Sequence, residues 1–135
     1  MSRKCFLSCG SLKSVEIPNS VKSLEDGCFF NCKSLQSIKI PSYVENIGSE
    51  CFRDCRKLES ITIPKSVIGL GDRVFKLYLS LNYVEIPDSV ESIGSECFMF
   101  CQSLETVKLP STIKSLGYKM FSSCRSLRHI EIPNS

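Results

Sequence analysis

One spacing governs this chain, because its prolines and most of its phenylalanines recur every 23 residues. All six prolines follow the spacing: Pro18, Pro41, Pro64, Pro87, Pro110 and Pro133. Six of the eight phenylalanines follow it too: Phe6, Phe29, Phe52, Phe75, Phe98 and Phe121. A constant period of this length is typical of repeat proteins, in which each copy stacks on its neighbours. The chain is therefore predicted to fold as a solenoid.

The repeating unit reads C-F-x-x-C-x-S-L-x-x-I-x-I-P-x-S-V-x-x-I-G-x-x, and no insertion interrupts it. The copies cover residues 5–27, 28–50, 51–73, 74–96 and 97–119, with a partial copy at 120–135, and we expect them to form a single domain over residues 1–135. Ordering a residue costs about 1.5 kcal/mol, whereas each buried apolar side chain contributes only about 1.5–3 kcal/mol. One copy with about eight such side chains cannot stand alone, so stacking is required.

Each copy contains one predicted strand and one predicted helix. In the second copy Ile38 and Ile40 alternate with Ser37 and Lys39, as in a half-buried strand, and Pro41 ends it. The cysteine motif is then predicted to lie on a short helix with a capping residue before it and a basic residue after it. The capping residues would be Asp26, Ser49, Asp72 and Ser95, and the basic residues Lys33, Arg56 and Arg125. The predicted fold is an α/β solenoid of about six coils, with one parallel strand and one short helix per coil.

These motifs resemble the BspA-like, or Treponema pallidum type, leucine-rich repeat over essentially the whole chain. The resemblance rests on the combination L-x-x-I-x-I-P-x-S-V-x-x-I-G-x-x-C-F-x-x-C. One difference is systematic, since that family usually has alanine before the phenylalanine and this chain has cysteine there in four copies. The resemblance implies adhesion or other protein binding, in bacterial surface proteins or proteins of anaerobic protists, and it implies no catalysis.

The nine cysteines are interpreted mainly as core packing. The fourth copy replaces both motif cysteines by Val74 and Tyr78, and the sixth replaces the first by Met120. A position that accepts valine and methionine needs an apolar side chain, which is how a buried free cysteine behaves. Disulfides and zinc remain alternatives. The odd number of cysteines argues against a disulfide framework, and a row of pairs with one histidine in the chain argues against tetrahedral zinc.

We interpret the chain as a non-enzyme that needs no cofactor. The one histidine, His129, falls in a strand position, and no phosphate loop, catalytic Ser/His/Asp arrangement or paired-carboxylate motif interrupts the repeat. A net charge of +3 without a basic stripe argues against nucleic-acid binding. The expected partner is a protein of unknown identity.

Two surfaces are candidates for that partner. The first is the exposed face of the predicted sheet, which carries Glu16, Lys39, Thr62, Tyr83, Glu85, Lys108, His129 and Glu131. Neighbouring opposite charges there can also pair with each other, which would make this an ordinary solvated face. The second follows from Phe100, which with Phe30 breaks the template, and comprises Leu77, Leu79, Met99 and Phe100. An apolar patch of this kind often marks a contact site, although local packing around the bulky Tyr78 is the alternative.

The chain is not expected to insert into a membrane, since its longest apolar stretch is "CFMFC" and a span needs roughly 20 apolar residues. The start "MSRKCFLSCG" lacks the apolar region of a secretory signal, which with the odd cysteine count favours the cytoplasm. A cell-surface location, as part of a longer exported parent, is the alternative. Neither end carries a polar cap, so a longer array, or self-association through the ends or the Leu77/Phe100 patch, is also considered.

Overall fold

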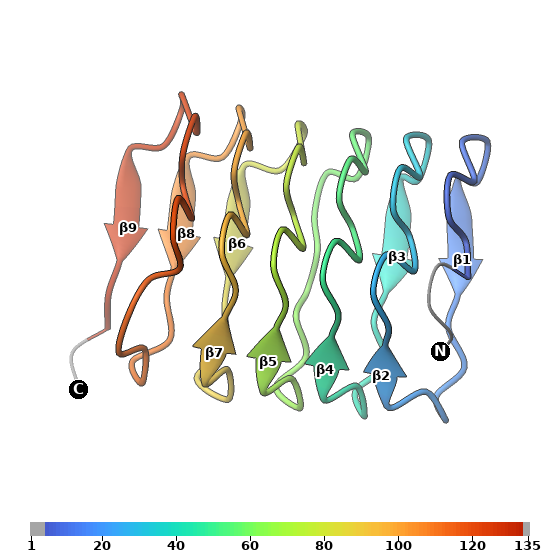
Figure 1. The fold of residues 1–135 in the computed structure, drawn as a ribbon, viewed down its shortest axis with the longest axis horizontal. Coiled ribbons are helices and arrows are strands. Elements are labelled where there is room, and N and C mark those ends of the chain that lie inside the picture. The colour runs from blue at the N-terminus through green and yellow to red at the C-terminus, as the bar shows by residue number, and fades with distance from the viewer. Residues whose placement is uncertain (1–4, 134–135) are drawn as a thin grey trace.

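The computed structural model describes residues 5–133, which wind into successive coils of a solenoid (Figure 1). We number the coils 1 to 6 in the order of the repeats. One side of the solenoid carries parallel strands that pair at an offset of one repeat, such as Ser14 with Ser37. These strands are β1 (Ser14–Glu16) and β3 (Ser37–Lys39) in one sheet, and β6 (Tyr83–Glu85), β8 (Thr106–Lys108) and β9 (His129–Glu131) in another. We call this side the sheet side, and it confirms the predicted parallel strand in five of the six coils.

A second side carries a parallel sheet that the sequence analysis missed. It consists of β2 (Ser23–Leu24), β4 (Asn46–Ile47), β5 (Gly69–Leu70) and β7 (Ser92–Ile93), in that order. A strand of two residues is too short to show alternation of apolar and polar side chains, so the sequence carries no period-two signal for it. With two strand-forming sides, the fold is a β-solenoid.

The predicted helix is wrong, since no helix occurs among residues 5–133. In the cysteine motif the backbone N–H groups alternate between two kinds of partner. Those of Gly27, Phe29 and Asn31 donate to carbonyls of the next coil, and those between them donate to the residue three positions earlier. An α-helix needs every N–H to bond four residues back within its own segment, so bonds to the next coil exclude it. The motif instead forms a series of tight turns.

Left-handed backbone makes these turns, at two positions of the repeat. Gly27 and Asn31 have φ of 63° and 62°. The equivalent positions elsewhere are also left-handed: Ser8, Glu50, Asp54, Arg73, Leu77, Glu96, Phe100, Lys119 and Ser123. Because left-handed residues cannot continue a right-handed helix, each one reverses the local path of the chain.

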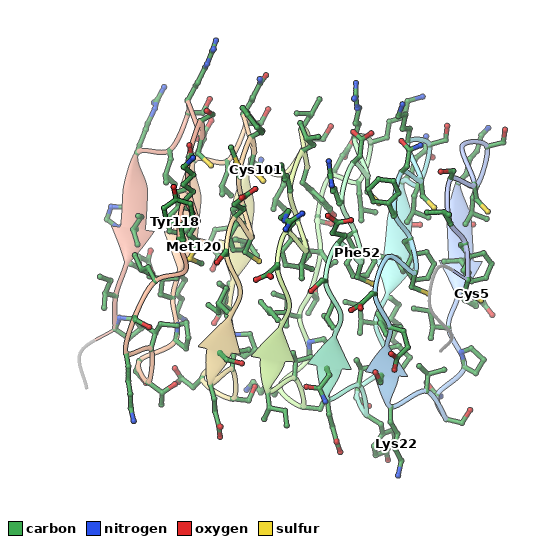
Figure 2. The ribbon with its side chains drawn as sticks, in the orientation of Figure 1. Cys5, Lys22, Phe52, Cys101, Tyr118 and Met120 are labelled. Atoms are coloured by element: carbon green, nitrogen blue, oxygen red, sulfur yellow. The ribbon has the colours of Figure 1, made fainter. Side chains whose placement is uncertain are left out.

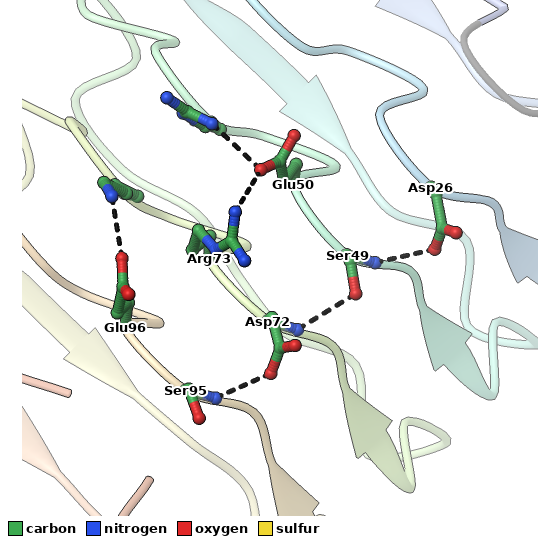
Figure 3. Close-up of polar contacts among 9 residues, drawn as sticks. Asp26, Ser49, Glu50, Asp72, Arg73, Ser95 and Glu96 are labelled. Atoms are coloured by element: carbon green, nitrogen blue, oxygen red, sulfur yellow. Dashed lines mark hydrogen bonds and ion pairs between the residues drawn. The ribbon is translucent and has the colours of Figure 1, made fainter. Parts of the chain in front are cut away.

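The residues predicted as helix caps connect coils instead (Figure 3). Asp26 Oδ1 accepts a hydrogen bond from the Ser49 backbone N–H at 2.9 Å, and Ser49 Oγ accepts one from the Asp72 N–H at 3.1 Å. Asp72 Oδ1 accepts from the Ser95 N–H at 2.8 Å. The chemistry expected of a cap, a side-chain oxygen that accepts from a backbone N–H, is present, but the N–H belongs to the following coil.

The core is a column of phenylalanine rings, one per coil, surrounded by aliphatic and cysteine side chains. Successive ring centroids lie 5.2 to 6.0 Å apart with nearly parallel planes. Phe29, Phe52, Phe75 and Phe98 are completely buried (Figure 2 labels Phe52). No polar or charged residue is buried in the part of the chain that the structure describes. The core is therefore shared between coils, as the 23-residue period predicts.

Candidate functional site

The sheet side presents the first set of predicted site residues to solvent. Glu16, Lys39, Glu85 and Glu131 are exposed on their strands, and Lys108 is half-buried. Thr62, Tyr83 and His129 are exposed as well, although coil 3, which contains Thr62, has no strand on the sheet side. Alternation along a strand sends these side chains outward, while Val84 and Val107 between them point into the core. The structure thus places this set on one side of the solenoid.

Tyr83, Glu85 and Lys108 form a connected group at the middle of that face. Lys108 Nζ donates to Glu85 Oε1 at 2.8 Å, and the Tyr83 hydroxyl donates to Glu85 Oε2 at 3.4 Å. The hydrogen bond from Lys108 lowers the pKa of Glu85, and the same bond raises the pKa of Lys108. Partial desolvation, and next the Glu85 charge, raise the pKa of Tyr83. Since the two charges satisfy each other, the Tyr83 ring remains as the apolar element of this group.

The Tyr83 ring is accessible, with 46% of its surface exposed. The equivalent positions on the neighbouring coils hold Ser60 and Thr106, whose side chains are too small to cover it. A shallow hollow beside the ring is lined by Thr62, Lys65 and Asn82 among others. At the end of the same side His129 Nε2 lies 3.9 Å from Glu131 Oε1, with both side chains exposed.

The second predicted set is half-buried: Leu77, Leu79, Met99 and Phe100. A basic side chain covers Phe100, since Lys76 Nζ lies 5.9 Å from its ring centroid and also pairs with Glu96 at 2.7 Å. The other phenylalanine that breaks the template, Phe30, lies under the Arg53 guanidinium at 5.3 Å. Cation–π contacts of this kind stabilise an aromatic ring at a surface without any partner.

The backbone at this second set is unusual for its residues. Leu77 and Phe100 have φ of 61° and 63°, a region that large side chains rarely adopt. The same position in other coils holds Asn31, Asp54 or Ser123, and asparagine and aspartate tolerate left-handed backbone. The sequence carried this signal, since small polar residues dominate the position, but the prediction of a helix hid it. Two bulky apolar residues here are a local cost to the fold.

The nine cysteines are all free thiols. Six are fully buried, namely Cys28, Cys32, Cys51, Cys55, Cys97 and Cys101. Burial raises the pKa of Cys28 to about 11 and that of Cys97 to about 12. These thiols stay protonated at neutral pH, which makes them poor nucleophiles. Packing therefore accounts for the first cysteine of the motif.

The second cysteine of the motif has a further role that the sequence did not reveal. Its thiol donates to the carbonyl of the phenylalanine in the preceding coil, as Cys55 Sγ does to Phe29 O at 3.2 Å and Cys101 Sγ to Phe75 O at 3.1 Å. Cys32 and Cys124 make the same bond at 3.0 and 2.9 Å. A weak donor in a dry core thus joins successive coils.

Within residues 5–133, no group of three or more histidine, cysteine, aspartate or glutamate side chains could hold a metal ion. A search of the same residues for a helix long and apolar enough to cross a membrane finds none. The geometry described above offers two candidate surfaces, the exposed sheet side around Tyr83 and the half-buried set around Phe100.

Comparison with known proteins places this geometry among leucine-rich repeats. The pattern described as "BspA type Leucine rich repeat region" matches residues 1–128 in six copies. A leucine-rich repeat protein of T. pallidum is 34% identical with a TM-score of 0.95, over 98% of this chain and 62% of that one. A leucine-rich repeat protein of Bacteroides ovatus is also 34% identical, with a TM-score of 0.92 over 96% of this chain and 34% of that one.

Two further similar structures carry more descriptive names. One is a leucine rich cell surface protein of Faecalibacterium prausnitzii, 31% identical with a TM-score of 0.87 over 93% of this chain and 33% of that one. The other is the pneumococcal vaccine antigen PcpA, 26% identical with a TM-score of 0.82 over 95% of this chain and 32% of that one. No curated protein matches the sequence. The chain thus spans less than two thirds of each of these solved relatives.

Proposed function

Because this chain belongs to the BspA-type leucine-rich repeat family, we propose that it is a non-catalytic protein-binding scaffold that serves in recognition or adhesion. Leucine-rich solenoids commonly bind proteins on their extended surfaces. The similar cell surface protein and the similar vaccine antigen are consistent with a role in recognition outside a cell. That likeness favours the cell-surface alternative over the cytoplasmic location expected from the sequence start.

The observation that carries the proposal is the Tyr83 ring, which is exposed at the centre of the sheet side. Tyrosine is enriched at binding hot spots, because it adds a rigid apolar ring with one polar end. Around it Glu85 and Lys108 already pair with each other, and their charges can form the polar rim of an interface. A protein surface with a pocket for the ring and groups that pair with this rim is the partner that this geometry fits.

Affinity capture from the native host, with the chain as bait, tests the proposal. We expect Tyr83→Ser to reduce retention of a captured protein by at least tenfold, because a hot-spot aromatic contributes about 2 kcal/mol or more. Tyr118→Ser is the matched control, since Tyr118 is a tyrosine that is 67% exposed and does not lie on a strand of the sheet side. Equal losses for both variants, or no loss for Tyr83→Ser, would contradict the proposal.

The alternative is a structural segment of a longer array, or a solenoid that associates with itself through its ends or the Leu77/Phe100 patch. The half-buried state of Leu77 and Phe100, and the cover from Lys76, favour local packing of this patch over a contact role. Sedimentation over a concentration series distinguishes the cases. Self-association predicts a weight-average mass that rises with concentration. Association through the patch predicts a return to the monomer value in Phe100→Asp, whereas association through the ends predicts no effect of this variant.

A further inference from the structure

The sheet side is interrupted at coil 3. Residues 60–62 stand at the positions of β3 and β6 but form no strand, and the sheet side is divided into a two-stranded and a three-stranded sheet. Among the described residues, the backbone of 59–63 makes no backbone hydrogen bond to the coil on either side. In Figure 1 the green segment of coil 3 that lies between β3 and β6 accordingly runs without an arrow.

The other two sides of coil 3 are bonded without a break. On the side that carries β2, β4, β5 and β7, the Ile68 N–H donates to Glu45 O at 2.8 Å, and the Glu91 N–H donates to Ile68 O at 2.9 Å. On the cysteine-motif side, the Phe52 N–H donates to Val74 O at 3.0 Å. Coil 3 is therefore held to its neighbours by backbone bonds on two sides out of three.

Tyr78 gives the break a physical cause. It takes the place of the second motif cysteine, is completely buried, and meets the Phe75 ring edge-on at 5.9 Å. Its hydroxyl reaches back to coil 3 and donates to Ser60 O at 3.5 Å. In the paired part of the sheet side, backbone carbonyls accept from the neighbouring coil, as Asn82 O, one position before the equivalent of Ser60, does from the Thr106 N–H. A phenol is much larger than a thiol, so the strand segment of coil 3 is displaced from this pairing.

The same substitution removes a bond at the other side of the core. In four coils the motif cysteine donates its thiol to the phenylalanine carbonyl of the preceding coil, and Tyr78 cannot do so for Phe52. The Phe52 and Phe75 rings also have the widest spacing in the described stack, 6.0 Å. Three separate features thus coincide at the junction of coils 3 and 4. They are the unpaired backbone of residues 59–63, the missing thiol hydrogen bond and the wider spacing of the phenylalanine rings.

We propose that this junction is a hinge, about which the solenoid bends by opening and closing its sheet side. The two continuous sides form the pivot, because their backbone bonds run unbroken through coil 3. The open side can change its spacing without breaking any backbone hydrogen bond, so this motion costs little free energy compared with the same motion elsewhere. Tyr83 follows the break directly, and bending therefore alters the curvature of the face around it.

Amide hydrogen exchange measured by NMR tests the hinge in the unmodified chain. We expect the amides of residues 60–63 to exchange at least tenfold faster than those of 106–109, the same positions two coils later. Equal protection of the two segments would overturn the proposal. Residual dipolar couplings provide a second readout: coils 1–2 and coils 4–6 should require two different alignment tensors, and a single tensor would refute a hinge.

Two variants of coil 4 test the assigned cause. Tyr78→Cys restores the repeat template and should slow exchange at Ile61 and Ile63 by about tenfold, because the strand of coil 3 can then pair. Val74→Cys restores the other template cysteine of the same coil, and should leave exchange in residues 60–63 unchanged. No slowing in Tyr78→Cys, or equal slowing in both variants, would overturn the role of Tyr78. Should Tyr78→Cys fail to fold, the comparison within the unmodified chain still decides the hinge.

Discussion

At the scale of single residues, most positions are explained by contact with the residue 23 places away. The phenylalanine rings stack on each other, the second cysteine bonds to the preceding coil, and Asp26, Ser49 and Asp72 accept from the next one. A side chain in this fold therefore acts mainly between coils. Substitution of such a side chain is expected to weaken the stacking between two coils more than it changes the conformation of the coil that carries it.

The thiols provide the first prediction. At pH 8, Cys28, Cys32, Cys51, Cys55, Cys97 and Cys101 should not react with a thiol-specific aromatic disulfide reagent, because burial raises the pKa of each and removes access. At most three thiols should react in the native protein, and all nine after denaturation without reductant. Fewer than nine after denaturation would indicate disulfides.

The left-handed positions provide the second prediction. Phe100→Asn should leave the free energy of unfolding nearly unchanged or raise it, because asparagine relieves a backbone strain of about 1–2 kcal/mol while the cation–π contact is lost. Phe30 also lies under a cation but lacks left-handed backbone, so Phe30→Asn loses its contact without this relief. Urea denaturation of both variants measures the difference. Equal losses in the free energy of unfolding for the two variants would show that backbone strain at Phe100 does not affect stability.

At the scale of elements, close contact with the neighbouring coil explains why glycine precedes the turns. A Cβ on Gly71 would lie 2.5 Å from the Ser49 backbone nitrogen, and Gly48 and Gly94 face similar contacts. In coil 1, which has no described coil before it, Glu25 occupies this position. Close backbone approach between coils thus requires glycine here.

Gly71→Ala should therefore lower the free energy of unfolding by about 1–3 kcal/mol, the usual range for overpacking. Gly10→Ala is the control, because its added Cβ would meet nothing closer than 3.9 Å. Thermal and urea denaturation of both variants gives the comparison. A Gly71→Ala variant as stable as Gly10→Ala would mean that coils 2 and 3 separate readily at this corner.

The sequence predicted the elements unevenly, for physical reasons. Alternation in segments such as 37–40 predicted the strands of the sheet side, since one face of each is buried. The helix was wrong, because spacing of apolar residues at i and i+4 fits a turn with two left-handed residues as well as a helix turn. The interruption at residues 60–62 was hidden as well, because their sequence, "SIT", has the same alternation as the paired coils. The proposed cause, Tyr78, lies 18 residues after Ser60.

At the scale of the whole molecule, the 23-residue period located both candidate surfaces, and the structure shows that they differ in exposure. The period placed Thr62, Tyr83 and Glu85 on one face, and the structure shows these exposed. It also placed Leu77 and Phe100 together, but the cover of Phe100 depends on the reach of Lys76, which no pattern of residue types encodes. The left-handed backbone at both residues was hidden by the prediction of a helix. The single domain expected over residues 1–135 stays a prediction.

Hydroxyl-radical footprinting of the complex with a captured protein tests the central claim, that the sheet side is the binding surface. Tyr83 and Met99 are both readily oxidised, so mass spectrometry reports on the two candidate surfaces in one sample. Binding on the sheet side predicts a severalfold loss of oxidation at Tyr83, with Met99 and the control Tyr118 unchanged. Protection of Met99 with Tyr83 still oxidised at its free rate would contradict the claim and assign binding to the Leu77/Phe100 patch.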